Sequence, residues 1–150
     1  MGASAWTIYN KAKERIGNGL LNLSTTPFRM ALFKSGSNFG TATLENYASL
    51  TSQVTNGNGY VTSGKTLAGE DWTVGASAKQ FKFDADDPAT WTASGGALSL
   101  IKGAVIFASG TSAGNRYLLC YASLSTAAFT LADGNTLTIQ FNASGIFTMT

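Results

Sequence analysis

The fold is decided by two apolar runs in the second half of the chain, Gly103-Ala104-Val105-Ile106-Phe107-Ala108 and Tyr117-Leu118-Leu119-Cys120-Tyr121-Ala122. Their β-branched and aromatic residues favour strands, and each run is too short for an ordinary helix. Residues 109–115, between the two runs, are rich in Ser, Gly and Thr, which is typical of turns. The sequence therefore predicts two neighbouring strands joined by a turn.

Five further segments have the pattern of strands: residues 28–34, 80–84, 89–93, 137–141 and 146–150. The first is mostly apolar, whereas the segments 80–84, 137–141 and 146–150 alternate polar and apolar residues, as half-buried strands do. Strands about ten to twelve residues apart, separated by glycine-rich turns, predict a mainly β fold. We expect an antiparallel sandwich of jelly-roll or Greek-key type, in which two sheets enclose the core.

A short amphipathic helix is expected near the start of the chain, within residues 4–20. Its apolar residues recur at offsets of three and four and so share one helical face, from which the charged residues largely point away. We expect residues 1–150 to form one domain, with 1–23 as the helical N-terminal segment and 24–150 as the β-sandwich. The apolar face comprises Trp6, Tyr9, Ala12, Ile16 and Leu20, and the charged residues are Lys11, Lys13, Glu14 and Arg15.

Charge is scarce and unevenly distributed. Charged residues make up 12% of the chain, about half of the roughly 25% found in ordinary soluble domains. The net charge of +2 is too small for the basic stripe of a nucleic-acid-binding protein, so no nucleic-acid partner is expected. Residues 1–34 carry five basic side chains and one acidic, and the rest of the chain is correspondingly acidic.

The composition also bears on location. The chain has no run of 18 apolar residues, and four of the five residues 11–15 are charged, where a signal peptide would need its apolar centre. We expect a soluble protein that is synthesised in the cytoplasm and has no membrane partner. The single cysteine, Cys120, excludes an internal disulfide and fits a reducing compartment.

Histidine is absent, which removes many enzyme mechanisms at once. A Ser-His-Asp or Cys-His nucleophile cannot be built, and zinc would find one thiolate and no imidazole. Cys120 lies within an apolar run and is predicted to be a small buried hydrophobe rather than a reactive thiol. We expect no catalytic residues, no cofactor and no metal site.

One motif matches a phosphate-binding loop. Residues 59–66, Gly-Tyr-Val-Thr-Ser-Gly-Lys-Thr, satisfy G-x-x-x-x-G-K-[ST]. That chemistry needs a buried strand before the loop and a helix after it, yet residues 51–58 are polar and Gly69 interrupts the segment that follows. Residues 56–59, Asn-Gly-Asn-Gly, are instead predicted to form a hairpin turn.

Carboxylates suggest two other kinds of site. Asp84, Asp86 and Asp87 could attract calcium, but they lack the spacing and the central glycine of a calcium-binding loop, and Pro88 follows at once, which favours a solvated turn. Sugar hydrolysis would need two carboxyl groups at a set distance from each other. Such a pair could come from these three residues or from Glu45, Glu70 and Asp71, but the sequence does not give the distance.

The order of several motifs resembles small structural proteins of tailed bacteriophages over about residues 20–150. These motifs are Asn58-Gly59-Tyr60 with Gly64, the segment Phe83–Asp87, the Trp91-centred strand, the Gly103–Phe107 strand and the closing Asn142–Phe147 segment. Some proteins of this look resemble capsid cement or decoration proteins with a jelly-roll-like sandwich. The resemblance implies a virion component without an active site. Among the positions on the particle, we expect the capsid surface, and the tail is the alternative. Lys102-Gly103 departs from the family pattern, so contacts near Lys102 are not transferred.

The function expected from this resemblance is to bind and stabilise the shell built by the major capsid protein, as a homo-oligomer, either a dimer or a trimer. The N-terminal face is the expected contact, because aromatic residues anchor interfaces and basic residues steer docking. The alternative for that face is packing on its own domain. The alternative function is a tail- or fibre-associated adaptor, or a carbohydrate-binding adhesin that uses Phe39, Tyr47 and Tyr60 in surface loops 35–64. The expected contact residues are Trp6, Tyr9, Lys11, Lys13 and Arg15.

Overall fold

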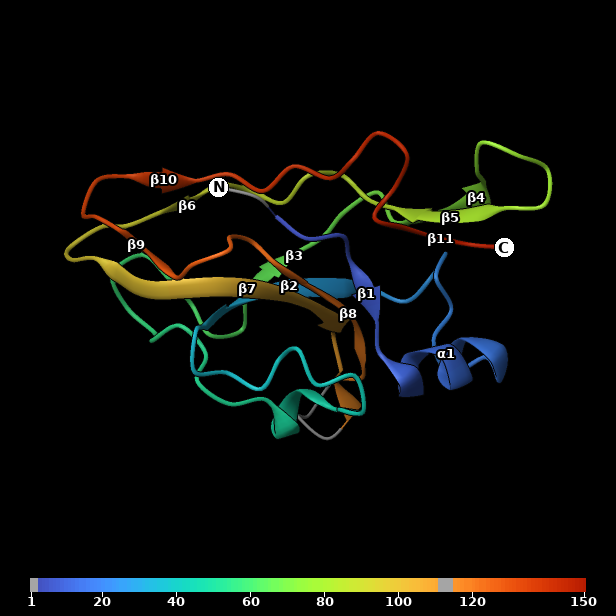
Figure 1. The fold of residues 1–150 in the computed structure, drawn as a ribbon, viewed down its shortest axis with the longest axis horizontal. Coiled ribbons are helices and arrows are strands. Elements are labelled where there is room, and N and C mark those ends of the chain that lie inside the picture. The colour runs from blue at the N-terminus through green and yellow to red at the C-terminus, as the bar shows by residue number, and fades with distance from the viewer. Residues whose placement is uncertain (1–2, 111–114) are drawn as a thin grey trace.

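An antiparallel sheet of six strands forms the centre of the computed structural model, which describes residues 3–110 and 115–150 (Figure 1). Two smaller antiparallel sheets lie along one side of it, and the helix α1 (Asn10–Gly17) lies on the other. The predicted mainly β fold with antiparallel sheets and one helix is confirmed. The central sheet contains β1 (Thr7–Ile8), β8 (Leu118–Ser123), β7 (Leu98–Ala108), β2 (Phe28–Lys34) and β3 (Lys65–Thr66) in that order, with β9 (Phe129–Leu131) paired to β7; the outer sheets are β11 (Phe147–Met149), β5 (Phe81–Asp84) and β4 (Asp71–Val74), and β10 (Thr136–Leu137) with β6 (Trp91–Thr92).

The middle of the central sheet is buried on both faces. β2 pairs along its whole length with β7, from Phe28 opposite Ala108 to Lys34 opposite Ile101. All six residues from Gly103 to Ala108 are buried, because apolar side chains occupy both faces of these strands. Continuous apolar runs of this kind are typical of strands covered on both sides. The two predicted strands, 103–108 and 117–122, pair as β7 and β8, whereas the connecting turn includes residues 111–114, which lie outside the described residues.

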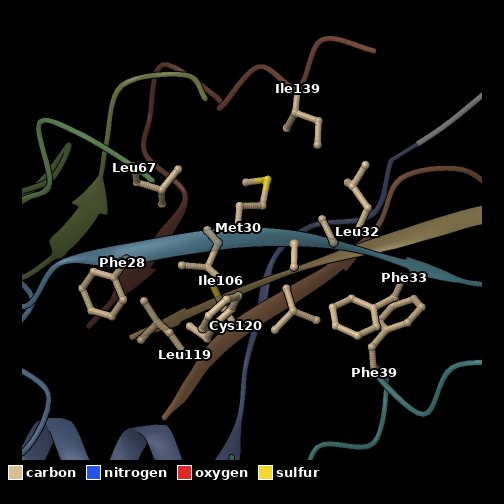
Figure 2. Packing of buried hydrophobic residues seen from close by; sticks show 14 of the residues in the cluster. Phe28, Met30, Leu32, Phe33, Phe39, Leu67, Ile106, Leu119, Cys120 and Ile139 are labelled. Carbon is tan, nitrogen blue, oxygen red and sulfur yellow. The ribbon is translucent and has the colours of Figure 1, made fainter. Parts of the chain in front are cut away.

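Different elements cover the two faces of this sheet. Met30, Leu67 and Ile139 lie on one side, toward the outer sheets, and Phe33, Phe39 and Leu119 lie on the other (Figure 2). On that second side the cover is α1 together with the segment 35–55 and its short 3-10 turn η1 (Tyr47–Ser49). The segment 35–64 is therefore more than a set of surface loops, because Phe39, Val54 and Tyr60 are buried in the core.

The N-terminal segment differs from the prediction. The helix ends at Gly17 with Asn18 as its C-cap, in the region where Gly17, Asn18 and Gly19 predict a stop, but it begins at Asn10 rather than near residue 4, and the residues before it are extended. The Tyr9 N–H donates to the Leu119 carbonyl (3.1 Å), so the chain satisfies its backbone by extending the central sheet at the edge of β8. Leu20, expected on the apolar face of the helix, lies beyond the helix end and is 57% exposed. The predicted helical segment 1–23 is thus part strand, part helix and part turn.

The C-terminal alternation also has a mixed outcome. Of the predicted strand 137–141, only Leu137 lies in a strand, β10 (Thr136–Leu137). The partner strand β6 has only two residues, so residues 138–141 continue without a paired strand. Burial still alternates along these residues, with Ile139 buried between exposed neighbours. The last segment forms β11, which ends at Met149, after the predicted turn closed by the Gly145 N–H donating to the Asn142 carbonyl (2.8 Å).

Candidate partner-binding surface

Tyr9 belongs to the core. Its side chain is fully buried, its ring lies 4.7 Å from that of Tyr121, and its hydroxyl donates a 2.6 Å hydrogen bond to the Phe39 carbonyl. Burial, with smaller contributions from Cys120 and Tyr121, raises the pKa of Tyr9 far above its ordinary value. A partner cannot reach this side chain at the surface, and the alternative that this face covers its own domain describes Tyr9 correctly.

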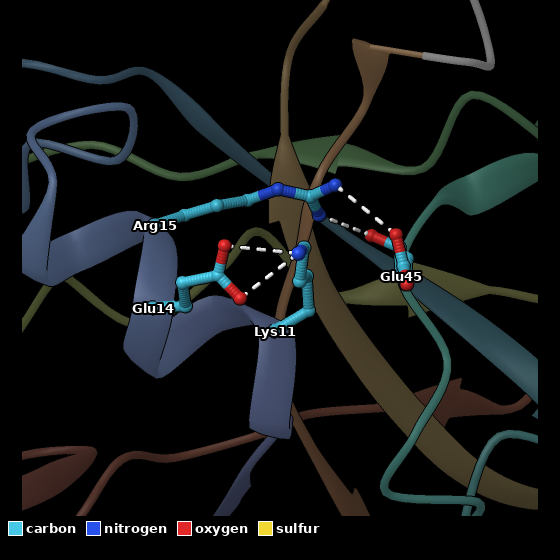
Figure 3. Close-up of polar contacts among 4 residues, drawn as sticks. All are labelled: Lys11, Glu14, Arg15 and Glu45. Carbon is cyan, nitrogen blue, oxygen red and sulfur yellow. Dashed lines mark hydrogen bonds and ion pairs between the residues drawn. The ribbon is translucent and has the colours of Figure 1, made fainter.

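Arg15 is likewise directed inward, although it is charged. It is 7% exposed, its guanidinium lies 3.9 Å from the centre of the Tyr117 ring, and Nη1 donates to the Glu45 carbonyl (2.8 Å). A weaker ion pair joins Nη2 to the Glu45 carboxylate at 3.6 Å (Figure 3). Arg15 therefore fastens α1 to the segment that covers the sheet, and its charge is not offered to a partner.

The remaining residues of the predicted contact are accessible to different degrees. Lys11 is half-buried, lies beside Arg15 and pairs with Glu14 at 2.8 Å (Figure 3). Trp6 is half-buried, with its ring 6.0 Å from that of Phe141. Lys13 is exposed and forms no ion pair with any described residue. Of the five predicted contact residues, only Trp6 and Lys13 line a common surface feature.

That feature is an open groove of about 1200 Å³, which we call the edge groove. One wall is the N-terminal segment from Ala3 to Ile8, another is the α1 residues Lys13, Ile16 and Gly17, and the third is the C-terminal segment 144–150. Figure 1 shows β1 and α1 on one side of this region and β11 on the other. The groove thus brings residues 3–8 together with residues 144–150, which are far apart in the sequence.

A second surface lies on the hairpin of β4 and β5. Trp72 pairs with Phe83, and Val74 pairs with Phe81, so these four side chains share one face of the hairpin. At its inner end Phe83 is buried against Phe28, whereas at its outer end Val74 is 54% and Phe81 is 42% exposed. Trp72 stacks on Phe81 with ring centroids 5.6 Å apart. We call Trp72, Val74 and Phe81 the arm surface.

The sequence contains a signal for the arm surface in residues 71–74. Asp71-Trp72-Thr73-Val74 alternates polar and apolar residues in the same way as the predicted strand 80–84, and the two form the hairpin. Alternation alone shows which residues share a face. It does not show that the apolar face extends past the core, because that depends on where the central sheet ends beneath it.

The phosphate-loop match has no phosphate-binding geometry. Gly57 and Tyr60 exchange backbone hydrogen bonds of 2.8 and 2.9 Å around Asn58 and Gly59, both of which have positive φ. This is the predicted hairpin turn. Lys65 follows in β3, which pairs with β2, and its ammonium lies 5.4 Å from the centre of the Trp91 ring. No helix follows the loop among residues 67–110, so the motif lacks the helix N-terminus that would hold phosphates.

The predicted acidic cluster is divided among separate contacts. Asp84 pairs with Lys82 at 3.6 Å, and Asp87 accepts a hydrogen bond from the Phe141 N–H (2.7 Å). Within the described parts of the chain, no three His, Cys, Asp or Glu side chains are placed to hold a metal ion. Cys120 is fully buried as predicted, and burial raises the pKa of its thiol well above the ordinary value.

The three aromatic residues considered for carbohydrate binding are held within the fold. Phe39 and Tyr60 are buried, and Tyr47 packs its ring 4.7 Å from that of Phe107. The Gln53 side chain joins the two tyrosines, because its Nε2 donates to the Tyr60 hydroxyl (2.8 Å) and its Oε1 accepts from the Tyr47 hydroxyl. None of the three rings is presented as an open platform for a sugar.

Comparisons with protein-family models, with curated proteins and with solved structures find no match. Among the helices of residues 3–110 and 115–150, none is long and apolar enough to span a membrane. The arm surface and the edge groove are the two candidate sites, because each exposes apolar side chains or open backbone edges at the surface.

Proposed function

We propose that this protein is a non-enzymatic structural component of a tailed-bacteriophage virion, which binds the outside of the capsid shell and stabilises it. The resemblance of residues 20–150 to small phage structural proteins supports this assignment. The protein would be synthesised in the host cytoplasm and would then join the major capsid protein on the particle. No nucleic-acid or membrane partner is part of this proposal.

The observation that carries the proposal is the arm surface. Val74 and Phe81 expose 54% and 42% of their surface at the end of a hairpin whose inner half is core. Large apolar side chains exposed together mark contact sites, and aromatic anchors dominate the binding energy of interfaces. In a protein with few charged residues, this surface is a suitable anchor on a neighbouring subunit.

The proposed assembly is a homo-oligomer, a dimer or a trimer, that bridges shell subunits. The other face of the arm hairpin is polar and half-buried, with Thr73 and the Lys82–Asp84 pair. The hairpin therefore has one apolar face and one polar face. A protein that bridges two neighbours needs a directional contact of this kind.

We also propose that the central sheet and the outer sheets form a sandwich of jelly-roll or Greek-key type. Contact between the layers supports this, because Phe28 of β2 and Phe83 of β5 meet edge to face with ring centroids 5.4 Å apart. The cover of α1 and the segment 35–55 on the opposite face is then an addition to the sandwich.

A tail or fibre adaptor is the alternative within the virion. Its carbohydrate-binding form loses support because Phe39, Tyr47 and Tyr60 are engaged in internal contacts. The copy number in purified particles separates the two locations: hundreds of copies indicate the shell, and tens or fewer indicate the tail.

The direct test is binding to purified shells that lack the protein, measured by co-sedimentation. The double variant Val74→Asp, Phe81→Asp is expected to bind at least about tenfold more weakly, because each carboxylate must be desolvated in an apolar contact. Val61→Asp is the matched control, since Val61 is 59% exposed and lies outside the arm. It should bind like the parent.

Two results would overturn the proposal. One is a parent protein that does not bind or stabilise shells. The other is a double variant that keeps the parent's melting temperature and also keeps full binding. A melting temperature measured for every variant separates loss of contact from loss of fold.

A further inference from the structure

We propose that the edge groove binds an extended segment of another polypeptide, which adds as a strand to the open edge of β11 and places an acidic side chain beside Lys13. The inference concerns a second site and does not depend on the proposed function. The occupant is an extended segment with alternating apolar residues and one acidic side chain.

The first argument is the open edge of β11. The order of the outer sheet is β11-β5-β4, so one side of β11 has no partner strand among the described residues. The Gly75 N–H donates to the Gln80 carbonyl (2.7 Å), and the Ile146 N–H donates to the Phe83 carbonyl (2.7 Å). These two bonds establish which residues of β5 face β4 and which face β11.

The alternation of antiparallel pairing then gives the direction of the backbone groups of Thr148. With Gly75 bonded to Gln80, Lys82 bonds toward β4, whereas Phe81 and Phe83 bond toward β11. Thr148 lies opposite Lys82, so its N–H and C=O point away from β5. Thr148 also lines the groove, and these two groups are therefore available to an incoming strand.

The opposite wall contributes a second open edge. β1 is the last strand of the central sheet, and the Tyr9 N–H bonds to Leu119 across β8. By the same alternation, the backbone groups of Ile8 face away from β8, and Ile8 lines the groove. The groove therefore has open backbone groups on two of its walls, at Thr148 and at Ile8. Exposed edges are sites for strand addition unless charge, proline or a covering element blocks them.

The size and the lining of the groove favour a polypeptide over a small molecule. Its volume of about 1200 Å³ is larger than the roughly 300–1,000 Å³ of most small-molecule sites. Apolar side chains from all three walls line it, namely Trp6, Ile16 and Met149, together with the buried Phe147. A strand with alternating apolar residues would turn those residues toward this lining.

The charge of Lys13 indicates which side chains the incoming segment would carry. Lys13 is the charged side chain that lines the groove, it is exposed, and the described residues provide it with no ion pair. Its neighbours Lys11 and Arg15, by contrast, are both paired. An Asp or Glu in the incoming segment would complement Lys13 and fix the register of the segment.

The probe is a library of random twelve-residue peptides selected on the immobilised full-length protein. We expect the selected peptides to alternate apolar and polar residues and to carry an acidic residue. The tightest of them is then synthesised and titrated by calorimetry. In NMR spectra, its binding should shift and protect the amides of Ile8 and Thr148.

Two pairs of variants test the site. Thr148→Pro removes an N–H that points away from β5 and should weaken binding of the synthesised peptide about tenfold. Thr66→Pro is the control, because the Thr66 N–H points outward from β3 at the far edge of the central sheet, and it should leave peptide binding unchanged. Lys13→Glu should weaken it at least about fivefold, whereas Lys79→Glu, an equal change of charge at an exposed residue outside the groove, should not.

A peptide variant keeps the test decisive if Thr148→Pro does not fold. N-methylation of the peptide amides that face β11 should abolish binding to the unaltered protein, and methylation of the alternate amides should preserve it. The proposal is wrong if no peptide is selected, if both methylation patterns bind equally, or if the NMR shifts lie outside the groove.

Discussion

The hydroxyl of Tyr9 donates a 2.6 Å hydrogen bond to the backbone carbonyl of Phe39, and this bond ties the start of the chain to the segment that covers the same face of the central sheet. The ring of Phe39 lies in turn directly over Gly103 of β7. The contact joins three parts of the chain that are far apart in sequence. The N-terminal segment is thus part of the fold, and Tyr9 is a core residue.

Tyr9→Ala should lower the free energy of unfolding by about 3–5 kcal/mol, because it removes a fully buried aromatic side chain. Tyr9→Phe should cost about 1–3 kcal/mol, since it leaves the Phe39 carbonyl without its donor. Trp6→Ala, at a half-buried position, should cost less than Tyr9→Ala. Urea denaturation of the three variants checks this order. A Tyr9→Ala variant of parental stability that no longer bound shells would instead assign Tyr9 to the partner.

Gly103→Ala should destabilise the protein by about 1–3 kcal/mol through overpacking. A Cβ at this position would lie 2.2 Å from the Phe39 ring, so the ring would have to move. Replacing that ring by a smaller side chain should relieve the clash. We therefore expect the double variant Gly103→Ala, Phe39→Leu to lose less stability than the sum of the losses in the two single variants. A double-mutant cycle of unfolding free energies measures this coupling.

Phe147→Ala should lower the free energy of unfolding by about 3–5 kcal/mol. Phe147 stacks on Phe83 with ring centroids 5.3 Å apart, and Ile146 beside it is also buried. Deletion of residues 144–150 removes both side chains and the whole of β11, and it should prevent soluble folding. Expression and thermal melting of the two variants provide the measurement, and a stable truncated protein would contradict the expectation.

Stability should fall as the pH rises above 10. Burial, the largest cause, raises the pKa of Tyr60 from 10.0 to about 12. Between these values the unfolded state has lost a proton that the folded state keeps, so the free energy of unfolding decreases with pH, by about 1.4 kcal/mol per unit for each such group. Below pH 10 this contribution is fully present. Tyr9 and Tyr47, whose pKa values are also raised by burial, act in the same direction.

The check is denaturation at pH 8, 10 and 11 for the parent and for Tyr60→Phe. The variant should be less stable at pH 8, because the Leu32 N–H and Gln53 lose their acceptor. It should also lose less stability between pH 10 and 11. Equal slopes for the two proteins would show that Tyr60 titrates normally in the folded state.

Of the five residues that the sequence predicts as partner contacts, two line the edge groove and two belong to the interior of the fold. Trp6 and Lys13 were identified as exposed contact candidates, and both line the edge groove. The sequence also predicts partner contacts for Tyr9 and Arg15, but both side chains are buried within the fold. Helical periodicity cannot report that residues 7 and 8 find a more favourable partner in the edge of β8, since that edge is built by residues more than a hundred positions away.

The sequence by itself determined the strands 28–34 and 103–108, the turn at Asn58-Gly59 and the burial of Cys120, because unbroken apolar runs and turn residues act locally. Only the tertiary structure decided which short segments became strands. A two-residue strand such as β1 or β10 has no local preference strong enough to define it and forms where a partner edge is open. The exposure of Val74 and Phe81 was decided in the same way, because a side chain is buried only where another element lies opposite it.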